Sequence, residues 1–151
     1  MTAAEALSLD FSLMTHVDVD GLAEETNLRL LALAILQAEG ATGGWTIVVA
    51  IVTDDELQAL HQQFLGIDEP TDIMTFPYGD GIAGGDLAIS ADHAIARAAE
   101  WGNTPAQEVA FLVAHGVLHL LGWHDTSHHQ RAAMLARQEE LVAQWRATRN
   151  A

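Results

Sequence analysis

Two histidines, His115 and His119, stand four positions apart within a strongly apolar segment at residues 109–121. On an α-helix this spacing places both imidazoles on one face, one turn apart, where they can bind a single metal ion. An imidazole without a partner costs free energy in apolar surroundings, which favours a metal ion or a hydrogen-bonding partner there. The spacing also arises readily by chance, so two ordinary, partly buried core histidines are the alternative interpretation.

A third ligand is expected directly after Gly122, because glycine readily adopts the left-handed conformation that ends a helix and turns the chain back. Both His124 and Asp125 follow this glycine, and both side chains are admissible zinc ligands. Three protein ligands and one open position form the catalytic arrangement of zinc, which lowers the pKa of a bound water to about 7. Gly116 stands where the HExxH metalloproteases have their glutamate, which disfavours a peptidase.

The composition restricts both the kind of metal site and its partners. The chain has no cysteine, so any zinc must be bound by nitrogen and oxygen atoms. Its formal net charge is −15, and all six basic residues are arginines. Such a charge repels a phosphate backbone at long range, which argues against nucleic-acid binding from composition alone. A bound metal ion or a local arginine cluster would counter this repulsion, and most carboxylates are expected to form a solvated surface.

The length and pattern of the chain predict a single domain over residues 1–151, of the α/β (α+β) class. A small mixed sheet of about four strands is expected to pack with about five helices, with the metal site at the end of a core helix. No apolar run approaches the ~20 residues of a membrane span, and the first residues lack the basic region of a signal peptide. The sequence therefore predicts a cytoplasmic protein without a membrane partner.

Strands are expected at residues 7–19, 45–52, 71–76 and 86–90, the first of them at a sheet edge. The run at residues 45–52 is β-branched without alternation, which is typical of a strand covered on both faces. A glycine-rich connection is expected at residues 78–85. Helices are expected at residues 22–38, 92–101, 106–121 and 130–146, and from a cap at Asp54 or Asp55 to Phe64. Thr104 and Pro105 supply the start signal of the helix at residues 106–121.

Three segments of the sequence together resemble one known protein family. The run HGVLHLLGWHD, from His115 to Asp125, is similar to the signature HGxLHLxGYDH of the YbeY-type endoribonucleases. The segment PTDIMTFP at residues 70–77 resembles the family's PTDVLSFP, and GDLAIS at residues 85–90 resembles its GDIVIS strand. These segments follow in the family's order, and the resemblance covers most of residues 54–125.

Membership of this family would imply a zinc-dependent endoribonuclease of the bacterial cytoplasm that is specific for single-stranded RNA. The resemblance implies action in 16S rRNA 3′-end maturation and ribosome quality control, with ribosomal RNA and the small ribosomal subunit as partners and no DNA. It also implies that His115, His119 and Asp125 bind one Zn²⁺ per chain, because the family's third ligand lies ten residues after its first histidine. The reaction would be metal-assisted hydrolysis of a phosphodiester bond, with no protein general base assigned.

This chain departs from the family pattern at two places. Leu65 stands where family members usually have an arginine, so we expect phosphate contact to move to Arg97, with Thr71 as a second candidate for substrate contact. The family's final Asp-His is reversed as His124-Asp125, which leaves His124 as the alternative third ligand.

Glu108 occupies a position where the family usually has an acid. It either orients a ligand imidazole by accepting a hydrogen bond or stabilises the first turn of its helix through its charge. Two rival functions are open at this point. One is a non-catalytic, zinc-containing ribosome-assembly factor, in which Leu65 marks lost catalysis, and the other is a metallohydrolase acting on another class of substrate.

Overall fold

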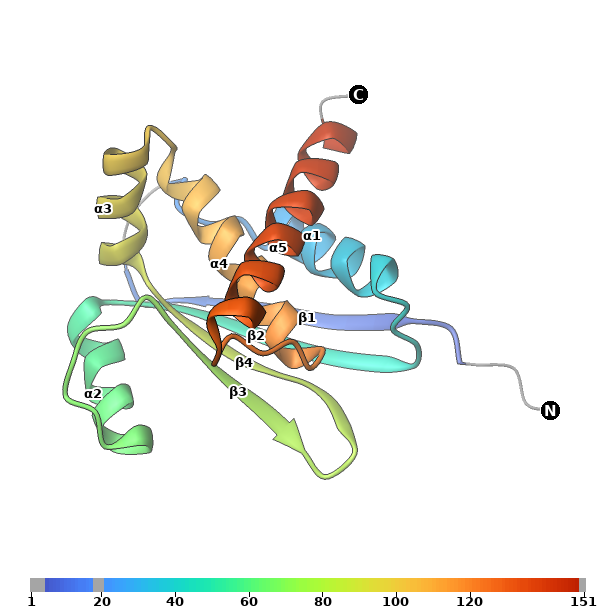
Figure 1. Cartoon of the computed structure of the whole chain (residues 1–151), viewed down its shortest axis with the longest axis horizontal. Helices are drawn as coiled ribbons and strands as arrows, with labels where there is room; N and C mark the ends of the chain where they lie inside the picture. Colours follow the sequence, from blue (N-terminus) through green and yellow to red (C-terminus); the bar gives the residue numbers. More distant parts are fainter. Residues whose placement is uncertain (1–4, 18–20, 150–151) are drawn as a thin grey trace.

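The computed structural model describes residues 5–17 and 21–149, which form four strands and five helices (Figure 1). The strands are β1 (Ser8–Thr15), β2 (Gly44–Val52), β3 (Ile73–Gly79) and β4 (Ile82–Ser90). The helices are α1 (Glu25–Ala38), α2 (Asp54–Leu65), α3 (Ala91–Trp101), α4 (Pro105–Leu120) and α5 (His128–Arg149). None of the described helices has both the length and the apolar character that a membrane crossing requires. The predicted α/β class is confirmed, while the end of the strand predicted at residues 7–19 lies outside the described residues.

The sheet has the strand order β1-β2-β4-β3, with β1 and β3 at its edges. Strand β1 pairs in parallel with β2, and β2 pairs in parallel with β4, whereas β3 returns antiparallel to β4. Parallel neighbours cannot be joined by a tight turn, so α1 connects β1 to β2, and both α2 and β3 lie between β2 and β4 in the chain. The sheet is mixed and β1 is an edge strand, as predicted.

The connection between β3 and β4 is shorter than the glycine-rich segment predicted at residues 78–85. It is a tight turn around Asp80, whose φ of 52° lies in the left-handed region, and Gly84 and Gly85 belong to strand β4. Gly84 has a φ of 121°, and a Cβ on it would collide with the carbonyl oxygen of Thr46 on β2. This glycine therefore permits a close approach between two strands and does not form a loop.

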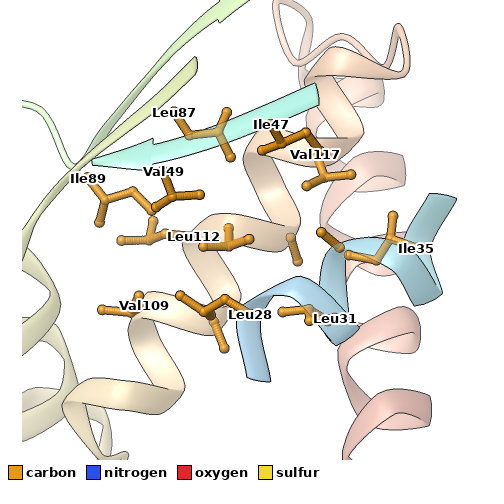
Figure 2. Packing of buried hydrophobic residues seen from close by; sticks show 14 of the residues in the cluster. Leu28, Leu31, Ile35, Ile47, Val49, Leu87, Ile89, Val109, Leu112 and Val117 are labelled. Carbon is orange, nitrogen blue, oxygen red and sulfur yellow. The ribbon is translucent and has the colours of Figure 1, made fainter. Parts of the chain in front are cut away.

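The main core lies between one face of the sheet and helices α1, α4 and α5. Helix α1 turns a stripe of leucine and isoleucine side chains toward α4 and the sheet, as an amphipathic helix does. Helix α4 is buried along most of its length, which accounts for its strongly apolar composition. Figure 2 shows packed side chains from α1, β2, β4 and α4, among them Leu28, Leu31, Ile35, Ile47, Val49, Leu87, Ile89, Val109, Leu112 and Val117.

The opposite face of the sheet carries α2, which packs on β3 and β4 through a smaller cluster (Figure 1). That cluster comprises Val52, Leu57, Met74 and Ala88. The side chains of Val48 and Ala50 point to the same face of β2 and stay partly exposed, because α2 covers this face only in part. The prediction that the strand at residues 45–52 is covered on both faces is therefore wrong for its central part.

The start of α2 differs from the prediction. Its cap is Thr53, and not Asp54 or Asp55: the Thr53 hydroxyl accepts the N–H of Glu56 at 3.1 Å, and the Glu56 carboxylate accepts the N–H of Thr53 in return. This reciprocal pair is a capping box, which satisfies two backbone donors that the helix leaves open. The Asp54 carboxylate instead accepts a hydrogen bond from His93 Nδ1 at 2.7 Å.

The other helices begin close to their predicted starts. Helix α4 follows its predicted cap Thr104 with Pro105 as its first residue. Helix α1 begins at Glu25 and not at Leu22, because Leu22 is buried ahead of the helix as part of the core. Helix α4 is thus fixed at its start by a cap and along its length by the core, and it packs against both β3 and β4.

Candidate metal centre

Helix α4 carries both candidate histidines on one face, close to its C-terminal end. The chain leaves the helix at Gly122, whose φ of 103° is readily available to glycine. The N–H of Gly122 donates to the carbonyl of His119, and the N–H of Trp123 donates to the carbonyl of Leu118, both at 3.0 Å. This closing turn reverses the chain and returns Asp125 to the histidine face, which is the geometry expected from the sequence.

The ligand atoms of His115, His119 and Asp125 lie close enough to share one ion. The Nε2 atoms of the two histidines are 3.1 Å apart. Asp125 Oδ2 lies 3.3 Å from His119 Nε2 and 3.5 Å from His115 Nε2. A tetrahedral site with bonds of about 2.0–2.1 Å separates its ligand atoms by about 3.3 Å. The three residues therefore have the spacing of a metal site.

The outer nitrogen of each imidazole is held by an oxygen acceptor. His119 Nδ1 donates to the carbonyl of Trp123 at 3.0 Å, and His115 Nδ1 donates to Gln138 Oε1 at 3.0 Å. The orientation of the Gln138 amide is fixed in turn, because its Nε2 donates to the carbonyl of Phe111 at 2.9 Å. In their neutral form both imidazoles therefore carry their proton on Nδ1, which leaves a lone pair on each Nε2.

The tautomer of the two imidazoles indicates whether the site is suited to a metal ion. With both imidazoles neutral, the lone pairs of His115 Nε2 and His119 Nε2 face each other and the carboxylate of Asp125, so three acceptors converge on one point. Such an arrangement is repulsive unless a cation occupies its centre. The donor set of two neutral imidazoles and one carboxylate matches known catalytic zinc sites, and the residues present therefore fit a metal cofactor.

Gln138 is a residue of the site that the sequence prediction missed. It lies on α5 and is 2% exposed. Its neighbours at helical spacing, Met134, Leu141, Val142 and Trp145, are apolar and buried. A polar side chain inside the apolar stripe of an amphipathic helix requires a partner, and this signal in the sequence could have identified it.

Glu108 does not orient the histidines. It lies in the first turn of α4, is 7% exposed, and accepts a hydrogen bond from Asn103 Nδ2 at 3.0 Å. Both nitrogens of the His115 imidazole are already engaged, one by Gln138 and the other toward His119. The interpretation of Glu108 as a residue that orients a ligand imidazole is therefore wrong, and its position fits the alternative role in the first helical turn.

Gly116 lies where α4 meets the sheet. A Cβ added to Gly116 would lie 2.7 and 2.8 Å from the two terminal methyl carbons of Leu87 on β4 and 3.1 Å from Ile73 Cδ1 on β3. A glutamate at this position would point into the helix–sheet contact and not toward the histidines. The close packing explains in physical terms why the general base of HExxH peptidases has no place here.

A cleft of about 760 Å³ opens beside the candidate ligands. Its walls are the end of α4 with the loop that follows it, the edge strand β3, and the end of α2. The polar side chains that line it are His61, Thr71, Asp72, Thr75, His124 and the three candidate ligands. None of the described arginines lines the cleft, so a bound metal ion would be its main source of positive charge.

The cleft contains one of the two residues predicted to contact substrate. Thr71 lines it and donates a hydrogen bond to the carbonyl of Ile73 at 3.4 Å. Arg97 lies outside the lining on α3, where its Nη1 donates to Asp72 Oδ2 at 3.1 Å. His124 is exposed and lines the cleft, but it does not belong to the group that could hold the ion. Substrate contact by Arg97 or Thr71 stays a prediction.

The loop that carries Asp125 is anchored to two other helices. The indole Nε1 of Trp123 donates to Glu39 Oε1, at the end of α1, at 3.1 Å. The same carboxylate oxygen lies 3.5 Å from Arg137 Nε on α5. Residues distant in the sequence thus fix the position of the loop relative to the histidines.

Comparisons with known proteins identify the family of this chain. A family model described as Endoribonuclease YbeY matches residues 15–146. The Endoribonuclease YbeY of Chloroflexus aurantiacus is 37% identical, over 87% of this chain and 94% of its own. The Endoribonuclease YbeY of a Roseiflexus species is 40% identical, over 71% of this chain and 74% of its own.

A solved structure shares the fold. The solution structure of a protein from Thermotoga maritima superposes with a TM-score of 0.65 at 28% identity, covering 92% of this chain and 93% of the other. The family model spans most of the sequence and includes both histidines, Gly122 and Asp125. This chain therefore belongs to the YbeY endoribonuclease family.

Proposed function

We propose that this protein is a zinc-dependent endoribonuclease that hydrolyses phosphodiester bonds in single-stranded RNA. The observation that carries the proposal is the convergence of His115 Nε2, His119 Nε2 and Asp125 Oδ2 at one wall of an open cleft. The relatives named Endoribonuclease YbeY support RNA as the substrate. The absence of cysteine and the two nitrogen ligands support zinc, since harder cations prefer sites made only of oxygen.

A zinc ion bound by these three side chains would activate water and polarise a phosphoryl oxygen. The protein itself contributes by holding the ligand side chains in position. Gln138 and the carbonyl of Trp123 hold the two imidazoles in the tautomer that binds metal. Asp72, the other carboxylate that lines the cleft, is paired with the Arg97 guanidinium, so the lining offers no unpaired carboxylate as a general base.

We extend the proposal to the biological role. Family membership supports action in 16S rRNA 3′-end maturation and ribosome quality control in the bacterial cytoplasm, with the small ribosomal subunit as partner. The net charge of −15 opposes a broad electrostatic interface with RNA. Productive contact would therefore be confined to the cleft and to the metal ion.

Metal analysis and a cleavage assay on the purified protein test the proposal. Protein prepared without chelator should contain about one zinc per chain, and it should cut a single-stranded RNA but not the same RNA in a duplex. Chelator should abolish cleavage, and added zinc should restore it. A protein that contains no metal and binds none when zinc is added would refute the central assignment.

Two histidine variants make the assay specific. His119→Ala removes one of three ligands and should remove most of the activity while the fold survives, because the core does not depend on the site. His128→Ala is the matched control, since His128 is exposed at the start of α5 and does not line the cleft. A folded His119→Ala variant with full RNase activity would exclude a catalytic metal here. A wild-type protein that binds ribosomal particles but never cuts RNA would favour the assembly-factor alternative.

A further inference from the structure

The free edge of β3 divides the cleft into two walls. Along this strand the side chain of Ile73 points to the α4 side, where it meets Gly116 near the candidate ligands. The side chains of Met74 and Phe76 point to the α2 side, where they belong to the smaller core cluster. A ligand that lies along the edge therefore has the metal site on one side and the end of α2 on the other.

The strand edge between the walls offers backbone polar groups. The carbonyl of Asp72 accepts the N–H of Ser90 on β4 at 3.0 Å, one step beyond the pair formed by Ile73 and Ile89. In an antiparallel ladder, alternate residues direct their N–H and C=O groups away from the partner strand. The backbone N–H and C=O groups of Ile73 and Thr75 accordingly face the cleft, where they can form hydrogen bonds with a bound polar ligand.

The α2 wall is aromatic and open. Phe64 and Leu65, in the last turn of α2, are 57% and 62% exposed, and both line the cleft. The rings of Phe64 and Phe76 meet edge to face, with centroids 5.3 Å apart and planes at 69°. An edge-to-face pair leaves ring faces free, so a third planar ring can stack on it. Large apolar side chains exposed together at the rim of a cleft mark a binding surface.

The charges of the cleft favour bases over phosphates as the source of affinity. None of the described arginines lines the cleft, and Arg97, close to it, is already paired with Asp72. The chain as a whole has a formal net charge of −15, which repels a phosphate backbone. An RNA strand can therefore gain affinity here from stacking of its bases and from a single metal-bound phosphate, and not from a row of cationic side chains.

We propose that Phe64, Leu65 and Phe76 form a nucleobase subsite, in which an unpaired base stacks across the strand edge from the phosphate held at the metal centre. This inference rests on the proposed function and deepens it. A base inside a duplex already has both faces stacked and cannot enter, so the subsite selects single-stranded RNA. Leu65 is part of the stacking surface in this chain, at the position where the family usually has arginine.

Binding measurements on three variants test the subsite. The affinity of a short, fluorescently labelled single-stranded oligoribonucleotide is measured by anisotropy, with zinc present and again with chelator. Phe64→Ala should weaken binding about tenfold in both conditions, because stacking does not require the metal. Phe64→Trp should restore it. Trp101→Ala is the aromatic control, since Trp101 is 70% exposed and lies outside the cleft, and its affinity should not change.

An oligoribonucleotide with one abasic position near its centre completes the test. The wild-type protein should bind it about as weakly as Phe64→Ala binds the intact strand, and the two proteins should no longer differ on the abasic strand. Equal binding of the intact strand by wild type and Phe64→Ala would overturn the subsite while leaving metal-dependent cleavage intact. A Phe64 effect in a protein that binds no zinc would instead leave the subsite standing and remove the proposed reaction.

The salt dependence of binding gives an independent measurement. With one phosphate contact, the slope of log K against log salt for wild type should lie between zero and about −1. Leu65→Arg adds a cation to the wall and should steepen the slope by about 0.7. A wild-type slope of about −3 or steeper would require several phosphate contacts and would contradict the proposal.

Discussion

Gln138 Oε1 lies 3.0 Å from His115 Nδ1 and joins α5 to the candidate metal site on α4. The Gln138 amide is held in the same orientation by the carbonyl of Phe111, so its oxygen can only face the imidazole. A buried amide thus selects the tautomer of a candidate ligand. Residues that hold ligands in this way typically affect metal affinity by about 10- to 100-fold.

Replacement of Gln138 should therefore weaken zinc binding without removing a ligand. Gln138→Leu has a similar volume but no acceptor, so zinc affinity should fall about 10- to 100-fold, as measured by competition with a chromophoric chelator. Gln138→Glu keeps an oxygen for His115 Nδ1 but loses the hydrogen bond to the carbonyl of Phe111, so its zinc affinity should lie between those of Gln138→Leu and wild type. Unchanged zinc affinity in a folded Gln138→Leu variant would show that the amide is only structural.

Asp125 should be the third ligand and His124 should not. Asp125→Ala should lower zinc affinity strongly, because it removes the oxygen that lies within 3.5 Å of both histidine nitrogens. His124→Ala should change it little, since His124 lies outside the group that could hold the ion. Zinc titration of both variants decides the question, and a loss of affinity confined to His124→Ala would reverse the assignment.

Gly116→Ala should destabilise the fold. The new methyl group would press on Leu87 and Ile73, and overpacking of this kind costs about 1–3 kcal/mol. Alanine regains up to about 1 kcal/mol through its higher helix propensity, so a net loss centred on about 1 kcal/mol in the free energy of unfolding is expected. Urea denaturation of both proteins measures it. Equal or higher stability of Gly116→Ala would mean that α4 has room to move away from the sheet.

Tyr78 should titrate well above the ordinary range. Burial, together with the hydrogen bond that its hydroxyl donates to Asp86 at 2.6 Å, raises the pKa of Tyr78 to about 12. The unfolded phenol titrates near pH 10, so its contribution to stability is complete below about pH 10 and is lost as the pH rises toward 12.

The chain has one tyrosine, so absorbance of the tyrosinate reports Tyr78 alone. A rapid pH jump, which records absorbance before the protein unfolds, should give a midpoint near 12 in wild type. The midpoint should be lower in Asp86→Asn, because a neutral amide no longer accepts the bond as a charged carboxylate does. A wild-type midpoint near 10 would contradict the combined effect of partial burial and the Asp86 hydrogen bond on this phenol.

Local signals in the sequence were sufficient to predict most of the fold. Thr104, Pro105 and Gly122 mark the start and end of α4 through backbone geometry that does not depend on the rest of the protein. The predicted cap of α2, Asp54 or Asp55, is wrong because Thr53 is also a good cap, and the reciprocal bond with Glu56 decides between them. The extent of strand β4 was underestimated because glycine signals a turn in the sequence but here allows two strands to approach.

The candidate site, like the fold, could be predicted from the sequence only in part. His115 and His119 could be proposed as a pair because one helix sets their separation, whereas the turn after Gly122 left His124 and Asp125 open, and only the resemblance to the family pointed to Asp125. Gln138 could not be found from the metal motif, because its contact with His115 depends on how α5 packs on α4. The ion pair of Arg97 with Asp72 likewise depends on packing between elements distant in the sequence.

The order of the elements along the chain determines when the metal site can form. All four strands of the sheet precede residue 91, whereas both histidines, Asp125 and Gln138 follow residue 114. A growing polypeptide emerges from its N-terminus, so the sheet is available before the helices that carry and orient the ligands. A nascent chain that stops short of Gln138 has every candidate ligand but lacks the amide that orients His115. Under the proposed function we therefore expect tight metal uptake to be a late step in biosynthesis, which requires a chain that has been made through α5.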